Sequence, residues 1–109
     1  MGKWRLPTVS ELQNAFDYEK GAPKIGGFTP DQYWSSTAFA GYKETIWIVN
    51  LRDGYAEFNY KTYPYCVRCV RQKDDGELEW SKPSDREMVW DEAREYCEAL
   101  NTKEGGGGL

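Results

Sequence analysis

The sequence contains no histidine, which removes the commonest general base and the commonest metal ligand. A nucleophile activated by histidine is therefore impossible within this chain. Basic residues are not in excess either, since 14 Lys and Arg against 18 Asp and Glu give a net charge of −4. Proteins that bind nucleic acids usually carry a basic patch, so we expect no nucleic-acid partner.

Long apolar runs are also absent. No run approaches the roughly 20 residues that a membrane-spanning helix needs, so we expect no membrane insertion. Polar and charged residues follow Met1 at once, which is not the pattern of a signal peptide. A length of 109 residues suits a single core, and we expect a single domain over residues 1–109.

Cysteine is scarce and odd in number, with Cys66, Cys69 and Cys97. Cys66 and Cys69 lie in a segment with strand character, and a strand turns residues three apart to opposite faces. The two thiols should therefore diverge, and we expect no zinc site. Asp31 and Asp53 are isolated oxygen ligands, whereas calcium takes about six or more. We expect neither a metal ion nor a cofactor.

Local patterns predict an α+β fold. A Thr-x-x-Glu capping box predicts a helix from Thr8 toward Lys20, and apolar residues at helical spacing predict a second helix over residues 89–101. Asp-Gly pairs at 53–54 and 75–76 predict two hairpin turns. The predicted strands are residues 33–37, 45–51, 55–60, 65–71 and 77–80.

Four motifs carry a resemblance to a known family: Trp4-Arg5-Leu6-Pro7-Thr8 with Glu11-Leu12, Tyr33-Trp34-Ser35-Ser36-Thr37, Trp47-Ile48-Val49-Asn50 with Asp53-Gly54, and Val67-Arg68-Cys69-Val70-Arg71. In this order they resemble the C-terminal domain family of the Legionella collagen-like protein (Lcl). That family is similar in fold to C-type lectins and to formylglycine-generating enzymes. The resemblance implies a C-type-lectin-like fold with two helices and short antiparallel strands.

The order of segments departs from that family. In the family, a strand like residues 78–82 and a helix like residues 88–97 precede the Trp-Arg-Leu-Pro motif, whereas here they follow it. We expect a circularly permuted domain: residues 1–71 are the family's C-terminal part, 72–76 the joint and 77–109 the family's N-terminal part. A natural permutant, an engineered one and a shifted cut of a tandem array all remain open. The oligomeric state is open too, with a monomer favoured.

The resemblance implies that the cysteine of the helix and that of the last strand pair, here Cys97 with Cys69. The residues agree, because Cys97 lies on the apolar stripe of the second helix and Cys69 alternates with Val67. Two buried free thiols are the alternative. Cys66 should stay a free thiol beside Arg68, with intermolecular pairing as the weaker alternative. The parent protein is expected to be secreted or on the bacterial cell surface, where disulfides persist.

The resemblance further implies a non-enzymatic binding or adhesion module. Trp34 and Trp47 belong to scaffold motifs and should pack in the core. Aromatic residues make up 16% of the chain, too many for one small core, so others should reach the surface and bind a glycan, a glycosaminoglycan or a protein. The expected ligand-binding residues, which flank the predicted turns or lie near them, are Tyr42, Lys43, Arg52, Tyr55, Lys61 and Tyr63.

Two other functions compete with this interpretation. The chain could be a structural repeat or an engineered permuted scaffold with no ligand of its own. An activity like that of formylglycine-generating enzymes is the less favoured alternative. Those enzymes use two cysteines in a substrate groove, whereas Cys66 and Cys69 are expected on opposite strand faces. The calcium-binding triplets of calcium-dependent lectins are missing from the sequence as well.

Overall fold

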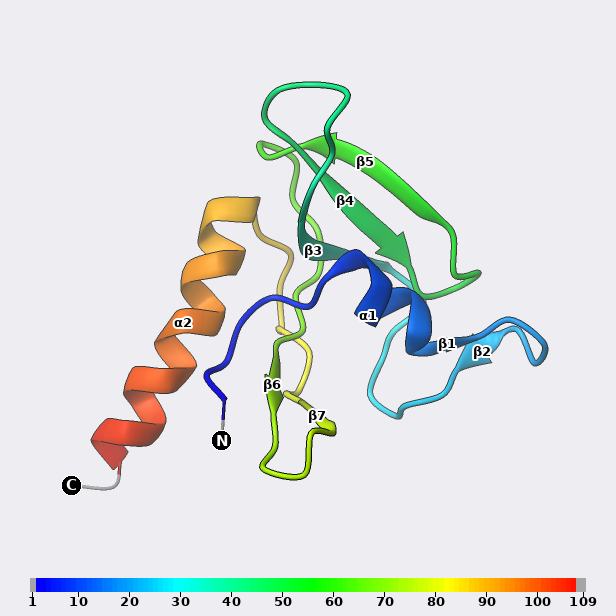
Figure 1. The fold of residues 1–109 in the computed structure, drawn as a ribbon. Coiled ribbons are helices and arrows are strands. Elements are labelled where there is room, and N and C mark those ends of the chain that lie inside the picture. The colour runs from blue at the N-terminus through cyan, green and yellow to red at the C-terminus, as the bar shows by residue number, and fades with distance from the viewer. Residues whose placement is uncertain (1, 108–109) are drawn as a thin grey trace.

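A computed structural model describes residues 2–107 as an α+β fold with two helices and short antiparallel sheets (Figure 1). The elements are α1 (Val9–Asn14), β1 (Phe16–Asp17), β2 (Ala22–Pro23), β3 (Gln32–Ala38), β4 (Thr45–Asn50), β5 (Ala56–Tyr60), β6 (Val70–Gln72), β7 (Leu78–Trp80) and α2 (Trp90–Gly107). The α+β class predicted from the sequence is confirmed.

The first helix, α1, begins at the predicted capping box. The Thr8 hydroxyl accepts a hydrogen bond from the Glu11 N–H at 3.1 Å, and the Glu11 carboxylate accepts one from the Thr8 N–H at 2.9 Å. The predicted extension toward Lys20 is wrong, because α1 ends at Asn14. Phe16 is buried and starts β1, which pairs with β2, so the chain turns back where the helix would have continued.

The main sheet has the strand order β3-β4-β5, antiparallel throughout. The hairpin predicted around Asp53-Gly54 is confirmed, since β4 and β5 pair directly and Gly54 adopts φ +79°. A side chain at Gly54 would collide with the rings of Tyr18 and Phe16, with contacts of 2.5 and 2.7 Å. This glycine is therefore required both by its backbone conformation and by the rings packed against it.

The strand predicted over residues 65–71 is largely wrong, because β6 covers only Val70–Gln72. Upstream of β6 the main chain pairs with three different partners. Tyr65 forms an isolated bridge with Met88, Cys66 bridges Tyr33 on β3, and the Cys69 carbonyl accepts a hydrogen bond from the Ser81 N–H at 2.9 Å. Because these three partners lie on different segments, residues 65–69 do not form a continuous β-ladder with any one strand.

The hairpin β6–β7 confirms the turn predicted at Asp75-Gly76. The Gly76 N–H donates to the Lys73 carbonyl at 2.9 Å, and Gly76 adopts φ +88°. On its other edge β6 bonds with the start of the chain, where the Arg5 N–H donates to the Val70 carbonyl at 2.9 Å. Strand β6 therefore lies between residues 2–5 and β7.

Two groups of buried side chains form the core. The larger joins α2 to the inner face of the main sheet and contains Trp4, Leu6, Trp34, Ile46, Ile48, Val67, Cys69, Met88, Ala93 and Cys97. The smaller lies beside α1 and contains Leu12, Phe16, Tyr33, Val49 and Leu51. Cys69 belongs to the larger group, whereas Cys66 packs against the smaller one, so the two thiols diverge as predicted.

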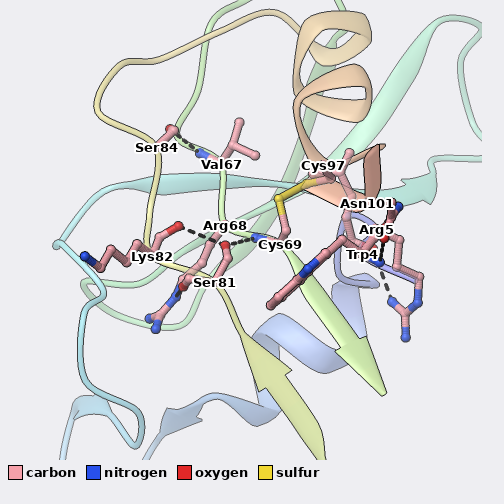
Figure 2. The surroundings of a disulfide bond; sticks show 11 residues. Trp4, Arg5, Val67, Arg68, Cys69, Ser81, Lys82, Ser84, Cys97 and Asn101 are labelled. Carbon is pink, nitrogen blue, oxygen red and sulfur yellow. Dashed lines mark hydrogen bonds between the residues drawn. A yellow bond between two sulfur atoms is a disulfide. The ribbon is translucent and has the colours of Figure 1, made fainter. Parts of the chain in front are cut away.

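Helix α2 is held against the rest of the fold by a disulfide and by hydrogen bonds at its two ends. Cys97 is bonded to Cys69, as the resemblance implied (Figure 2). At the start of α2 the Trp90 indole N–H donates to the Ser35 carbonyl at 2.9 Å. Near its end, the Asn101 side-chain amide accepts from the Trp4 N–H at 2.7 Å and donates to the Trp4 carbonyl at 3.1 Å.

Cys66 is a free, half-buried cysteine. Burial raises the pKa of its thiol to about 11, and the negative charges of Asp31 and Glu87 add to this rise. The Thr29 side chain, which hydrogen-bonds the thiol, acts in the opposite direction. The nucleophilic thiolate is consequently a minor species of Cys66 at neutral pH.

We predict that the double substitution Cys69→Ala and Cys97→Ala lowers the free energy of unfolding. The disulfide closes a loop with a sequence separation of 28 residues. A crosslink over such a loop stabilises a folded chain by about 3–4 kcal/mol, so we expect the double variant to lose about that much. Urea denaturation measures the free energy of unfolding of both chains. Reductant should destabilise the unsubstituted chain and leave the double variant unchanged. Cys66→Ala serves as the control for cysteine loss, and an unchanged midpoint in the double variant would contradict the prediction.

We predict that Cys66 reacts slowly with iodoacetamide in the folded chain. At pH 8 its rate should be at least roughly a hundredfold below that of the unfolded chain, whose thiol has a pKa of about 8.5. Because the folded pKa is raised, the rate should climb with pH toward about 11. Mass spectrometry of alkylated Cys66 gives the rate. A plateau near pH 8.5, the value of an ordinary thiol, would refute the raised pKa.

Candidate ligand-binding surface

The outer face of the β4–β5 hairpin is rich in aromatic side chains because successive residues of β4 face opposite sides of the sheet. Ile46 and Ile48 point into the larger core group. On the other side Val49 is covered by the smaller core group, but Trp47 is only half-buried. Trp47 lies directly opposite Phe58 in the register of β4 with β5. The predicted core position of Trp34 is confirmed, whereas Trp47 borders the solvent.

Four rings form a continuous aromatic stack on this face: Phe39, Tyr42, Trp47 and Phe58. The Phe39 and Phe58 rings are parallel, with centroids 3.9 Å apart. Trp47 meets Phe39 edge to face at 5.1 Å, and Tyr42 lies 5.7 Å from Phe58. Such contacts hold each ring in one orientation, so the surface is preorganised.

A groove of about 530 Å³ opens beside Trp47, toward the β4–β5 turn. Tyr18 and Tyr55 supply two further rings, and their side chains are 58% and 72% exposed. The Tyr18 hydroxyl donates to the Gly54 carbonyl at 2.6 Å, which fixes that ring at the groove wall. We call this depression the aromatic groove; its lining residues are Gln13, Tyr18, Trp47, Asp53, Gly54, Tyr55 and Ala56.

The aromatic groove continues along the hairpin. A neighbouring depression of about 410 Å³ shares Trp47 and Ala56 with it and is bounded by Glu57 and Phe58. Ring faces in a concave surface offer apolar contact area, while the Gln13 amide and the Asp53 carboxylate at the margin can hydrogen-bond. This combination suits a ligand with both an apolar face and hydroxyl groups.

The structure divides the six predicted ligand-binding residues between the two ends of the hairpin. Tyr55 lines the aromatic groove, and Arg52 is exposed in the same turn. Tyr42 and Lys43 are exposed in the loop between β3 and β4, at the other end of β4. Because β4 has six residues, the two ends are about 17–20 Å apart. One small ligand therefore cannot contact all of them.

The remaining two predicted residues, Lys61 and Tyr63, follow β5 at the end away from the groove. The Lys61 ammonium lies 3.2 Å from the Glu44 carboxylate and 4.8 Å from the centre of the Trp90 ring. Lys61 thus already has intramolecular partners. The side chain of Tyr63 is 51% exposed. The binding role of all six residues stays a prediction.

Several groove residues were not among those predicted from the sequence. Tyr18 lies in the segment that was expected to be helical, so its approach to Gly54 depends on the β1–β2 turn. Gln13, on α1, carries no pattern that marks a binding residue. Phe58, in the neighbouring depression, alternates in sequence with Ala56 and Tyr60, and that alternation was the available signal.

A third depression, of about 310 Å³, lies between α1, β7 and Ile25. Its acidic residues are Glu11 and Glu77. The Arg5 guanidinium donates to both Glu11 carboxylate oxygens, at 2.8 and 2.9 Å, and lowers the pKa of Glu11. Glu11 also caps α1, so it is committed to the fold.

Arg68 is a buried cation, only 6% exposed. Its guanidinium carbon lies 4.4 Å from the centre of the Phe28 ring and 5.7 Å from that of Trp80. The Arg68 Nε donates to the Ser81 carbonyl at 2.5 Å. Burial lowers its pKa, and within residues 2–107 no ion pair with a carboxylate offsets the desolvation. The two rings take the place of a counter-ion.

Within the described part of the chain, no group of three or more Cys, Asp or Glu side chains is placed to hold a metal ion. Across residues 2–107, no helix has both the length and the apolar character to cross a membrane.

Comparison with known proteins places the chain in a family. No curated protein and no solved structure matches it. One protein-family model, that of the Lcl C-terminal domain, matches residues 1–71, which are 71 of the 109 residues. The matched part includes the aromatic groove, the aromatic stack and Cys69, but not α2. The chain belongs to the Lcl C-terminal domain family.

Proposed function

We propose that the chain is a non-enzymatic binding module that takes a saccharide in the aromatic groove. The observation that carries the proposal is the concave arrangement of Tyr18, Trp47 and Tyr55, with Asp53 and Gln13 at its margin. A pyranose ring has apolar faces of C–H groups and a rim of hydroxyl groups. The aromatic rings suit its faces, and the carboxylate and amide suit its hydroxyls.

An extracellular location fits this function. The family is a bacterial one whose name refers to a collagen-like protein, and the chain carries a disulfide. Structural disulfides persist in oxidising compartments. The parent protein is accordingly secreted or exposed at the cell surface, where glycans and glycosaminoglycans are available as ligands.

The absence of catalysis is part of the proposal. Cys69 is bonded to Cys97, and Cys66 packs in the other core group with a raised pKa. A disulfide-bonded Cys69 and a protonated Cys66 in a different core group do not favour a paired-cysteine oxidase. Binding is also independent of calcium, because the carboxylates of the groove are too few to complete a calcium shell of about six oxygens.

The proposed architecture is a C-type-lectin-like fold in circularly permuted order, formed by one domain. In that fold the first and last strands are antiparallel neighbours. Here β7 and β6 pair antiparallel, and the family match stops at residue 71, next to their connecting turn. Asn101 hydrogen-bonds the main chain of Trp4, so the second half of α2 lies beside the first residues at that point. These observations support a joint at residues 72–76.

We predict that the chain is a monomer in solution, because the segment after the joint completes the core of its own chain. Size-exclusion chromatography with light scattering measures the mass directly. The expected result is a single species near 12.6 kDa. A strand-exchanged dimer with no monomer would instead favour a shifted cut of a tandem array.

We predict that a glycan array, read with calcium and with a chelator, gives the same specific signals in both conditions. Tyr55→Ala should weaken the strongest signal by about tenfold or more, because it removes an exposed ring from the groove. Tyr60→Ala is the matched control, because Tyr60 is an exposed tyrosine of the same hairpin outside the groove, and it should leave the signal unchanged.

Other outcomes of the array distinguish the competing functions. Equal losses in Tyr55→Ala and Tyr60→Ala would contradict the groove as the binding site. A blank array would favour a protein ligand or a scaffold with no ligand of its own. Thermal denaturation of both variants shows whether either loss reflects unfolding instead of a lost contact.

A further inference from the structure

Strand β5 forms an open edge of the main sheet. The strand order β3-β4-β5 places it last, and Figure 1 shows it at the outer rim of the hairpin. The opposite edge of the sheet is covered: the Trp34 N–H donates to the Cys66 carbonyl at 3.0 Å, and the Ser36 N–H donates to the Pro7 carbonyl at 2.8 Å. One edge of the sheet is thus protected and the other is not.

The register decides which main-chain groups of β5 point outward. The Lys61 N–H donates to the Glu44 carbonyl and the Asn50 N–H to the Tyr55 carbonyl, so odd-numbered residues of β5 bond with β4. In an antiparallel pair the hydrogen-bonded and non-hydrogen-bonded positions alternate. The N–H and C=O groups of Ala56, Phe58 and Tyr60 therefore point away from β4.

Two of these three residues keep free main-chain groups. The Tyr60 N–H donates to the Asn59 side chain at 2.8 Å, and the Tyr60 carbonyl accepts from the Tyr63 N–H at 3.1 Å. Within residues 2–107, the outward groups of Ala56 and Phe58 make no hydrogen bond. Two donors and two acceptors are available there, which is the set that an added antiparallel strand of three residues would use.

The side chains around this gap define the chemistry of such a strand. Ala56 and Phe58 share their face with Trp47, so that face of an added strand would meet apolar surface. Glu57, between them, faces the other way, is exposed and forms no ion pair among the described residues. The residue opposite Glu57 would be favoured as a cation.

We propose that the free edge of β5 binds an extended peptide with the pattern apolar-basic-apolar as an additional antiparallel strand. The two apolar residues lie opposite Ala56 and Phe58 and exchange main-chain hydrogen bonds with them. The basic residue lies opposite Glu57. This strand addition adjoins the proposed saccharide site at Ala56 and Trp47 but uses other groups, namely main-chain donors and acceptors and the carboxylate of Glu57 in place of the rings of Tyr18 and Tyr55.

The probe is the capped peptide acetyl-Lys-Val-Lys-Val-Lys-amide, titrated into the isotopically labelled full chain and followed by NMR amide shifts. The expected shifts centre on Ala56, Glu57 and Phe58. N-methylation of both valines should weaken binding by about tenfold or more, because it removes the donors that face β5. N-methylation of the central lysine, whose N–H points outward, is the matched control and should have little effect.

Two substitutions in the chain test the two parts of the contact. Glu57→Lys should weaken binding of the basic peptide by about tenfold. The same variant should bind better a second peptide in which glutamate replaces the central lysine. Phe58→Pro removes the outward N–H together with the ring, whereas Phe58→Ala removes the ring alone. Weaker binding in Phe58→Pro than in Phe58→Ala, with both variants folded by circular dichroism, identifies the main-chain bond.

Three results would overturn the proposal. The first is the absence of amide shifts at β5 at millimolar peptide. The second is equal binding of both N-methylated peptides, which would exclude main-chain pairing. The third is a dimer in light scattering that Phe58→Pro dissociates, which would show that a second copy occupies the edge. A blank glycan array leaves this test unaffected.

Discussion

The whole fold depends on the attachment of residues 81–102 to the larger core group. Residues 1–71 leave Trp34, Ile46 and Ile48 facing one side of the sheet, and Met88 with α2 covers them. The Cys69–Cys97 disulfide lies in the middle of this contact, and both of its cysteines are fully buried. Without that segment, the family-matched part of the chain would expose the inner face of its own sheet.

The packing of α2 on the inner face of the main sheet leaves the outer face of the β4–β5 hairpin available for binding. The isoleucines of β4 anchor one side of the hairpin and α1 covers Val49 on the other, so the rest of that outer side needs no further covering layer. Trp47 and Phe58 stay partly exposed, and neighbouring rings hold them instead of a second element. The same hairpin thus combines a rigid inner attachment with a rigid aromatic surface. Binding to a preformed surface avoids the entropy cost of ordering it.

The sequence predicted the features that depend on local patterns. The capping box of α1, both Asp-Gly hairpins, the helix over residues 89–101 and the divergence of Cys66 from Cys69 follow from spacing and turn chemistry alone. The features it missed depend on contacts distant in sequence. The early end of α1 follows from burial of Phe16. Trp47 is half-buried because α1 covers Val49 but not Trp47, two residues earlier on the same face of β4. The periodicity of the sequence does not show where α1 lies on that face.

The separation of the three cysteines also bears on how the chain acquires its disulfide. Three thiols allow three pairings, and only one joins Cys69 to Cys97. Cys66 packs against the smaller core group, whereas Cys69 and Cys97 both lie in the larger one, so the fold brings only Cys69 and Cys97 together. Oxidation after folding therefore yields a single product. An odd cysteine can mispair in an oxidising compartment, and here the tertiary structure keeps Cys66 in a different core group from the bonded pair.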